Sequence, residues 1–359
     1  MNLERIIQEF PKKYHAMPRK VEPLNENFII YGAPRSGKTV TLHRFLWDNC
    51  KQGKGIYIDF DDWRYEELSF KEFVEFAKTK NLTHIAIDNA PADLSSIDGI
   101  CIAAATKEKQ STKNFETLRL KALDFEEFIA FEKHGVKIED DSSLASVFGR
   151  FAHIGNLPEK LNYPDAQRVE LIQKNINNIC TNQTQKEILK ALCSHQSHQI
   201  SLLQLYTYIK QRCKISKDSL YESVQNFQNI ELLQTVTKYL SPKSPKKLYF
   251  SDFCLPSTLS DFRDFGRLFE NAVFCEMEHK DIFYTDALSF YIPSEQLAII
   301  TRPFDDKEAL EARIKKTVAK TKNLDIKRLA VITMHTNLEY NIGDIEIVAE
   351  PFWSWAVQK

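Results

Sequence analysis

The chain has 359 residues and a mass of 41.7 kDa, which exceeds one domain of about 150 residues and predicts more than one folded part. Hydrophobic residues make up 43% and charged residues 27%, a composition that excludes a disordered chain. The 48 basic and 49 acidic side chains leave a formal charge of -1, so nucleic acid or an anionic membrane would need a local basic patch.

No apolar run approaches the roughly 20 residues that span a bilayer. The seven Cys include no CxxC pair, which predicts reduced thiols rather than a disulfide framework or a zinc site. We therefore expect a cytoplasmic protein without a membrane segment.

The first elements along the chain alternate between strand and helix. An apolar run at 28–31 predicts a strand, and the helical spacing of Leu42, Phe45 and Leu46 predicts a helix over 40–50. The next predicted elements are a strand at 56–58, a helix over about 67–79, and strands at 84–88 and 99–105. This alternation predicts an α/β domain with a parallel sheet covered by helices.

A glycine-rich segment separates the first strand from the first helix. Its sequence, Gly32-Ala33-Pro34-Arg35-Ser36-Gly37-Lys38-Thr39, fits the GxxxxGK[ST] pattern of a loop whose backbone N–H groups surround phosphates. Lys38 is expected to reach the β- and γ-phosphates, and Thr39 to offer its hydroxyl to Mg²⁺. We predict that Mg-ATP is bound by Gly32, Ala33, Pro34, Arg35, Ser36, Gly37, Lys38, Thr39 and Val40.

A predicted strand ends in Asp88, the expected second Mg²⁺ ligand. Asn89 follows where a Glu would polarise the attacking water, and an amide cannot accept a proton. Hydrolysis is then slow, or Asp61 or Asp62, which follow the second strand, replace the missing base; the alternative for this pair is a solvated turn. Thr106, at the end of the next strand, is a candidate γ-phosphate sensor or an ordinary strand-end residue.

The remaining chain is predicted to contain a helical lid and two further parts. Helices are expected at 125–133, 143–153 and 166–179, then at 184–194, 200–210 and 216–228, with Ser216 as an N-cap and strands at 232–239 and 247–250. Three helices followed by a hairpin predict a winged helix. A small α/β part follows, with a helix after Asp261, strands at 282–292 and 296–301, a helix at 306–321 and strands at 328–333 and 345–349.

Six segments occur in an order typical of one family: Tyr31–Thr39, Ile85–Asp88, Leu120–Ile129, Gly155–Glu159, Lys246–Asp252 and Gly266–Val273. Their order resembles the AAA-type P-loop ATPases of bacteria and archaea that carry a winged helix and a C-terminal nuclease-like domain of unknown function. The resemblance implies an ATP-binding domain with its lid at 1–180 (the lid from about 125), a winged helix at 181–250 and the nuclease-like domain at 251–359.

The same resemblance implies roles for later residues. Gly155 and Pro158 look like the turn with which related ATPases contact the base or ribose; the alternative is a helix-ending glycine followed by a proline. A restriction-endonuclease-like site needs several carboxylates and a Lys around metal ions. Glu270 is present, but the second acidic position falls near Ser289 and the Glu-x-Lys strand has the sequence Ala298-Ile-Ile-Thr-Arg302. We therefore expect a degenerate domain that serves binding or assembly.

Together these features predict a P-loop ATPase that binds Mg-ATP, hydrolyses it slowly and passes a conformational change to the winged helix and the C-terminal module. Two alternatives remain. One is a DNA-binding regulatory protein, acting through 181–250, in which ATP is a switch. The other is a protein-interaction module, with its partner on 251–359, in which ATP is a structural ligand.

Overall fold

The structure is a computed structural model that describes residues 10–13, 16–17, 19–51, 53–132, 141–260, 263–278 and 281–357. It divides into two compact units. The first unit comprises Met1–Ala122 with Asn229–Glu231, and the second comprises Leu123–Gln228 with Leu232–Lys359. The finer division into lid, winged helix and nuclease-like domain stays a prediction.

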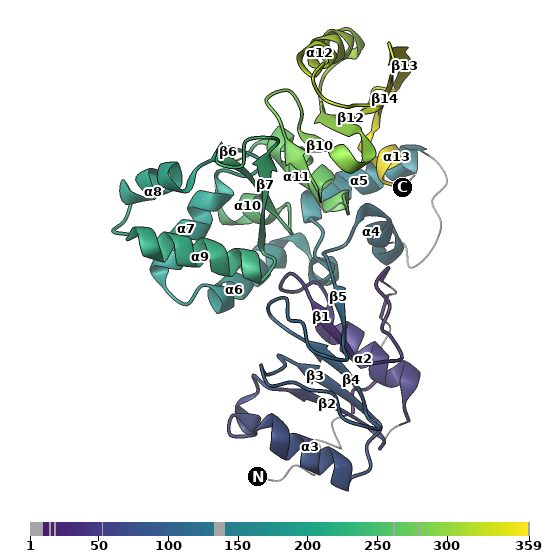
Figure 1. The fold of residues 1–359 in the computed structure, drawn as a ribbon, viewed down its shortest axis with the longest axis vertical. Coiled ribbons are helices and arrows are strands. Elements are labelled where there is room, and N and C mark those ends of the chain that lie inside the picture. The colour runs from purple at the N-terminus through teal and green to yellow at the C-terminus, as the bar shows by residue number, and fades with distance from the viewer. Residues whose placement is uncertain are drawn as a thin grey trace. The chain divides into compact units, whose positions relative to one another are not determined.

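The first unit contains a parallel five-stranded sheet in the order β2-β3-β4-β1-β5 (Figure 1). Its strands are β1 (Phe28–Tyr31), β2 (Gly55–Asp59), β3 (His84–Asp88), β4 (Cys101–Ala105) and β5 (Glu116–Arg119). The first four confirm predicted strands. The edge strand β5 was not predicted, because its sequence ETLR is polar and none of its residues is buried.

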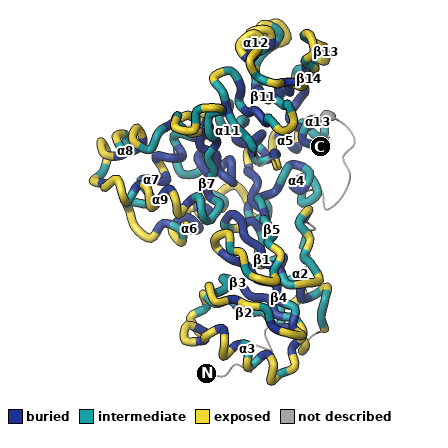
Figure 2. The backbone as a smooth tube through the Cα atoms, in the orientation of Figure 1, coloured by how far each residue is buried: buried dark blue, intermediate teal, exposed yellow. Residues whose placement is uncertain are grey.

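Two helices cover opposite faces of this sheet. Alternate residues of β1 divide between the faces: Phe28 and Ile30 pack with helix α2 (Lys38–Asn49), whereas Ile29 packs with helix α3 (Phe70–Thr79). The strands β1, β3 and β4 are accordingly mostly buried, whereas the edge strand β5 is not; Figure 2 colours the backbone by this burial. The helix α3 begins three residues later than predicted because Ser69 and Glu72 form a capping box around its first turn. A short 3-10 helix, η1 (Trp63–Tyr65), precedes it.

The helices of the second unit follow the predicted order. They are α4 (Phe125–Glu132), α5 (Asp141–Ile154), η2 (Pro158–Asn162), α6 (Asp165–Ile179), α7 (Gln183–Cys193), α8 (Leu202–Lys210), α9 (Lys217–Asn229), α10 (Leu255–Leu259), α11 (Phe265–Glu276), η3 (Pro293–Glu295), α12 (Lys307–Lys320) and α13 (Phe352–Ala356). The predicted N-cap is confirmed, since the Ser219 N–H donates to Ser216 Oγ at 3.0 Å. The short α10 and α13 were not predicted.

A nine-stranded sheet runs through the second unit in the order β13-β14-β12-β11-β10-β9-β7-β8-β6. Its strands are β6 (Gln199–Ile200), β7 (Leu233–Lys238), β8 (Lys246–Phe250), β9 (Phe283–Tyr284), β10 (Phe290–Ile292), β11 (Leu297–Thr301), β12 (Arg328–Thr333), β13 (Leu338–Ile342) and β14 (Ile345–Pro351). The predicted strand at 282–292 is two short strands, because the Thr285 hydroxyl accepts the N–H groups of Ala287 and Leu288 in a turn.

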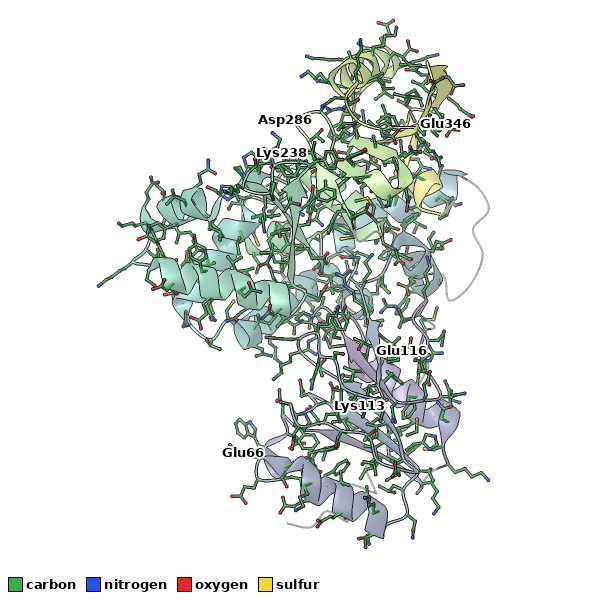
Figure 3. The ribbon with its side chains drawn as sticks, in the orientation of Figure 1. Glu66, Lys113, Glu116, Lys238, Asp286 and Glu346 are labelled. Carbon is green, nitrogen blue, oxygen red and sulfur yellow. The ribbon has the colours of Figure 1, made fainter. Side chains whose placement is uncertain are left out.

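The hairpin β7-β8 and the C-terminal strands belong to this one sheet, because β7 also pairs with β9 in parallel. The Lys238 ammonium and the Asp286 carboxylate lie 2.7 Å apart at this junction (Figure 3). The sheet therefore continues across position 250, where the winged helix and the C-terminal domain were predicted to meet.

An aromatic cluster forms the main core of the second unit. Phe125, Phe148 and Phe151 from α4 and α5 pack against Phe352 of α13 with ring centroids 4.6–6.1 Å apart. Full burial of each such side chain stabilises the fold by about 1.5–3 kcal/mol. The helices predicted to begin the lid thus share a core with the C-terminal elements. Among the described residues, no helix combines the length and apolar character needed to cross a membrane. All seven cysteines are free thiols.

Candidate functional site

The predicted phosphate loop connects β1 to α2 at the carboxyl edge of the parallel sheet. A Cβ atom on Gly32 would lie 1.9 Å from the Leu120 carbonyl oxygen, so only glycine fits there. Gly37 has a φ of 106° at the start of α2, a backbone conformation that favours glycine. Arg35 is also left-handed, with a φ of 66°. The sequence spacing and the backbone geometry therefore agree on a strand, a tight loop and a helix start.

The Lys38 ammonium lies over this loop. Its Nζ donates to the carbonyl oxygens of Gly32 at 2.8 Å and Ala33 at 3.1 Å. Burial lowers the pKa of Lys38 to about 8, and the carboxylate of Asp88 opposes this shift. A phosphate at the loop would meet an ammonium whose present partners are only weak, neutral acceptors.

Thr39 and Asp88, the two predicted Mg²⁺ ligands, are brought together. The Thr39 hydroxyl donates to Asp88 Oδ2, and the Tyr57 hydroxyl donates to the same oxygen at 3.2 Å. Burial is the main cause that raises the pKa of Asp88, and the charge of Asp59 adds to it. A hydroxyl beside a carboxylate is a donor set that suits a hard cation such as Mg²⁺, and a cation would offset the repulsion between the two carboxylates.

Sequence reasoning missed Arg19, which braces the loop from outside the motif. Its guanidinium donates to the Ser36 carbonyl at 2.5 Å and to the Lys121 carbonyl at 2.8 Å. Arg19 is 9% exposed, and Ser36 is fully buried. The Ser36 hydroxyl has no hydrogen-bond partner among the described residues. No sequence pattern around Arg19 could have revealed contacts across 17 and 102 positions.

The other predicted residues of this edge have partners of their own. Asp61 is paired with Lys107 at 2.5 Å, and Asp62 caps η1 and is paired with Arg64 at 2.6 Å. Thr106 is buried, and its hydroxyl donates to the Glu108 carbonyl at 2.7 Å. The roles of Asp61 and Asp62 as bases and of Thr106 as a sensor stay predictions.

A second feature that the sequence did not reveal links β2 to β3. Asp59 and Asp88 are register partners at the ends of these strands. Asn89, which has a φ of 49°, donates from Nδ2 to Asp59 Oδ1 at 2.8 Å. The amide at the expected position of the catalytic glutamate is therefore bound to a carboxylate on the neighbouring strand.

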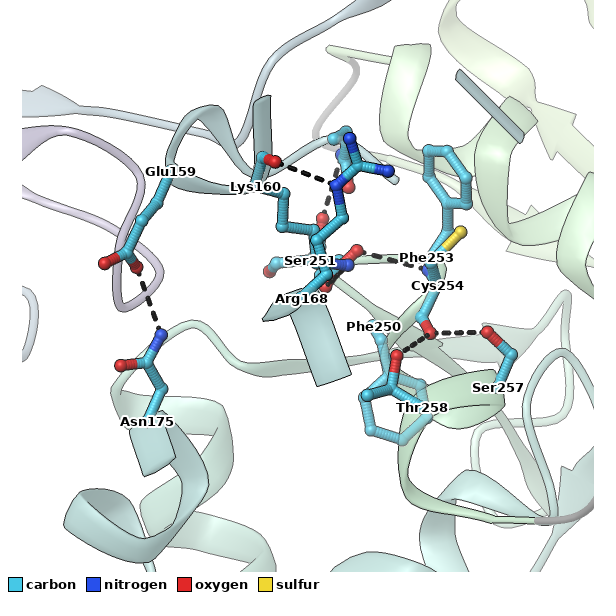
Figure 4. A network of polar contacts seen from close by, with 12 residues as sticks. Glu159, Lys160, Arg168, Asn175, Phe250, Ser251, Phe253, Cys254, Ser257 and Thr258 are labelled. Atoms are coloured by element: carbon cyan, nitrogen blue, oxygen red, sulfur yellow. Dashed lines mark hydrogen bonds and ion pairs between the residues drawn. The ribbon is translucent and has the colours of Figure 1, made fainter. Parts of the chain in front are cut away.

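Gly155 and Pro158 lie in the second unit beside a buried ion pair. Lys160 Nζ and Asp252 Oδ2 are 2.5 Å apart, and each side chain is 3% exposed. Gly155 has a φ of 87°, and a Cβ there would lie 2.6 Å from Asp252 Oδ1. Figure 4 shows the surrounding network, in which Arg168 donates to the Lys160 carbonyl at 3.0 Å. Local packing thus accounts for the glycine, and the nucleotide contact stays a prediction.

Glu270 occupies a polar cluster in the second unit. Its Oε1 accepts from Lys247 and Tyr249, each at 2.8 Å. Its Oε2 accepts from the Ser289 hydroxyl at 2.9 Å and faces the Thr301 hydroxyl at 3.4 Å. The resemblance had singled out Ser289 and the segment Ala298–Arg302, and both Ser289 and, within this segment, Thr301 lie against Glu270. The carboxylate is bound by a lysine and hydroxyls of the chain itself.

The chain matches no protein-family model. It is 24% identical over 414 residues to Uncharacterized protein MJ1544 of Methanocaldococcus jannaschii, which covers 97% of this chain and 93% of the relative. Among solved structures it is similar to the Walker-type ATPase PABY2304 of Pyrococcus abyssi, with a TM-score of 0.44, 15% identity and coverage of 66% and 91%. It is also similar to the Orc1 protein of Aeropyrum pernix in complex with DNA, with a TM-score of 0.33, 11% identity and coverage of 66% and 86%.

The class of protein follows from the first unit itself. A buried parallel strand, a GxxxxGK[ST] loop and a helix that begins at the motif lysine make a P-loop. The chain therefore contains a P-loop domain, with the loop at the carboxyl edge of a helix-covered parallel sheet.

Proposed function

We propose that this protein binds ATP with Mg²⁺ at the phosphate loop and hydrolyses it slowly to ADP and phosphate. The observation that carries the proposal is the contact between the Thr39 hydroxyl and Asp88, beside Lys38 at the start of α2. This contact joins the loop to the end of β3, so phosphate and metal ligands come from elements far apart in the sequence. A structural turn that merely resembled the motif would not require this pairing.

Each residue has a distinct part in this proposal. The backbone N–H groups of the loop surround the phosphates, and Lys38 leaves the carbonyls of Gly32 and Ala33 to bind them. Thr39 and Asp88 would hold Mg²⁺, which supplies positive charge to the phosphate oxygens when bound. Asn89 cannot take up a proton, so hydrolysis is slow unless a carboxylate elsewhere in the unit serves as the base.

The proposed switch begins at Arg19. This guanidinium binds the Ser36 carbonyl of the loop and the carbonyl of Lys121, which lies two residues before the second unit begins at Leu123. A nucleotide that moves the loop changes both contacts together, and so favours one arrangement of the chain segment that leaves the first unit. In this proposal the winged helix at 181–250 and the C-terminal module at 251–359 respond to that change.

Isothermal titration calorimetry with Mg-ATP tests the binding. Wild type is expected to bind, and Lys38→Ala to lose most of the affinity while keeping the same thermal stability. Lys51→Ala, an exposed lysine just beyond the end of α2, is the matched control and should bind like wild type. Absence of binding to wild type would overturn the proposal. Binding with turnover equal to that of Lys38→Ala would instead favour a structural ATP.

A second proposal, DNA binding through 181–250, is supported by one surface feature. Lys210 and Lys217 lie 5.7 Å and 5.9 Å from the Tyr206 ring, and Arg212 lies 4.2 Å from the Tyr208 ring. Exposed cations beside aromatic rings suit a phosphate backbone. The test is duplex affinity measured against salt concentration: charge reversal at Lys210 and Arg212 should flatten the dependence, and a salt-independent affinity would contradict the proposal.

A further inference from the structure

The amide at position 89 faces a carboxylate rather than replacing one. Asp59 closes β2, Asp88 closes β3, and the two are register partners in parallel strands. Asn89, the next residue after Asp88, turns its side chain toward Asp59 through a left-handed backbone. A carboxylate is thus present at the edge where a base is needed, but it comes from the neighbouring strand.

The hydrogen bonds of Asp59 leave one of its oxygens available. Asn89 Nδ2 donates to Asp59 Oδ1 at 2.8 Å, and the backbone N–H of Asp61 donates to the same oxygen at 3.0 Å. Within the part of the chain that the structure describes, no hydrogen bond is directed to Asp59 Oδ2. The carboxylate is therefore oriented through one oxygen, while the other has no hydrogen-bond donor among the described residues, and the side chain is half-buried.

The other carboxylates near this edge, Asp61 and Asp62, each have a cation partner. Asp61 is held by the Lys107 ammonium, and Asp62 by the Arg64 guanidinium and the backbone of η1. Both carboxylates are therefore already engaged by a cation of the chain. Among the described residues, Asp59 has no ion-pair partner.

We propose that Asp59 is the general base of ATP hydrolysis and that Asn89 is its positioning residue; this inference rests on the proposed function. The oxygen of a water molecule forms a bond to the γ-phosphorus, and the bond from that phosphorus to the bridging oxygen breaks, with its electron pair leaving on ADP. The proton of the water passes to Asp59 Oδ2 and later to solvent. Asn89 keeps Oδ1 occupied, so that Oδ2 faces the water.

The experiment measures ATP turnover and Mg-ATP affinity separately on the full-length chain. Asp59→Asn is expected to lower kcat by about 100-fold or more. It should change the affinity for Mg-ATP less than threefold, because the phosphate loop that binds the nucleotide is unchanged. Asn89→Ala should lower kcat by a smaller factor and add little in the Asp59→Asn background, because a positioning residue has no effect once its base is absent. Asp59→Asn with Asn89→Glu should recover turnover, since a carboxylate is restored on the adjacent residue.

Asp98→Asn, an exposed carboxylate of the same unit, is the control and should hydrolyse ATP like wild type. Thermal unfolding of each variant separates loss of base from loss of fold. Wild-type turnover in Asp59→Asn would overturn the inference, as would loss of turnover in Asp61→Asn but not in Asp59→Asn. If wild type binds Mg-ATP but turns over no faster than Lys38→Ala, the inference fails while the binding proposal stands. If wild type does not bind Mg-ATP, both fail.

Discussion

Two carboxylates with little exposure to solvent, one in each unit, have opposite surroundings. Asp88 is 9% exposed and accepts hydrogen bonds from neutral donors, the hydroxyls of Thr39 and Tyr57 and the N–H of Asn89. The Glu270 side chain is 13% exposed and is bound by the ammonium of Lys247. The first carboxylate has no cation in contact with it among the described residues, whereas the second has its counter-ion supplied by the chain.

This difference in surroundings distinguishes a carboxylate that can bind a cation from one that serves a structural contact. A buried carboxylate without a cation is costly, and a bound cation removes that cost. A carboxylate that already has a lysine and hydroxyls around it gains little from a metal ion. Asp88 therefore has the surroundings of a ligand-binding residue, and Glu270 those of a residue that joins α11 to β8, β11 and the residue just before β10.

The largest expected effect comes from breaking the Glu270 pair. Lys247→Met removes the ammonium that contacts the largely buried Glu270 carboxylate and is expected to lower the free energy of unfolding by about 3–5 kcal/mol, measured by urea denaturation. Adding Glu270→Gln should recover most of this loss, because the uncompensated charge is removed. Lys243→Met, at an exposed position, should change stability by less than about 0.5 kcal/mol. An equally small effect of Lys247→Met would show that the pair is dispensable.

The matching substitution in the first unit, at Asp88, should weaken ligand binding strongly and leave stability unchanged or higher. Asp88→Asn is expected to weaken the Mg²⁺-dependent part of ATP binding by about 100-fold or more, because the proposed Mg²⁺ ligand is lost. Stability should be kept or increased, since burial raises the pKa of Asp88 and the neutral amide escapes that penalty. Calorimetry with and without Mg²⁺ and a thermal melt measure the two effects. A destabilised Asp88→Asn that still binds Mg-ATP would reverse the roles assigned to the two carboxylates.

The brace on the loop should have an intermediate effect. Arg19→Ala is expected to weaken Mg-ATP binding by about tenfold, equivalent to roughly 1.4 kcal/mol, because the loop must be ordered on binding. Arg19→Lys should not restore the affinity, since one ammonium cannot replace a planar guanidinium that reaches two carbonyls. Arg64→Ala, an exposed arginine of the same unit, is the control. Unchanged affinity in Arg19→Ala would show that the hydrogen bonds of Arg19 to the loop do not contribute to Mg-ATP binding.

The smallest effect concerns pH. The pKa of Lys38 is about 8 in the free protein, and a bound phosphate would raise it, so binding above pH 8 takes up a proton. The contribution of Lys38 protonation to the affinity for Mg-ATP should therefore be constant below pH 8. Above pH 8 the affinity should fall by up to about tenfold per pH unit. Lys38→Arg keeps its charge throughout and should show a flat profile if it binds. An equal decline in that variant would attribute the effect to another group.

Sequence patterns predicted what depends on neighbouring residues. The strands β1, β3 and β4 and the loop glycines follow from apolar runs and one motif. The pairing of Thr39 with Asp88, 49 positions apart, was expected only because both were predicted to be ligands of the same Mg²⁺ ion. Features set by distant contacts were not predictable: Arg19 on the Lys121 carbonyl, Asn89 on Asp59, and the edge strand β5, whose sequence is polar. The predicted strand at 282–292 was wrong at its centre, since a hydroxyl turn at Thr285 interrupts an otherwise apolar run.

The parallel pairing of β7 with β9 has a practical consequence. Thr237 and Lys238 of β7 pair with Phe283 and Tyr284, so a fragment that ends at 250 would uncover backbone N–H and C=O groups along this edge. Bare strand edges recruit strands from other chains. Fragments cut between the hairpin and the C-terminal strands are therefore expected to self-associate. DNA binding is better measured on longer chains that retain β9, where apparent affinity does not reflect aggregation.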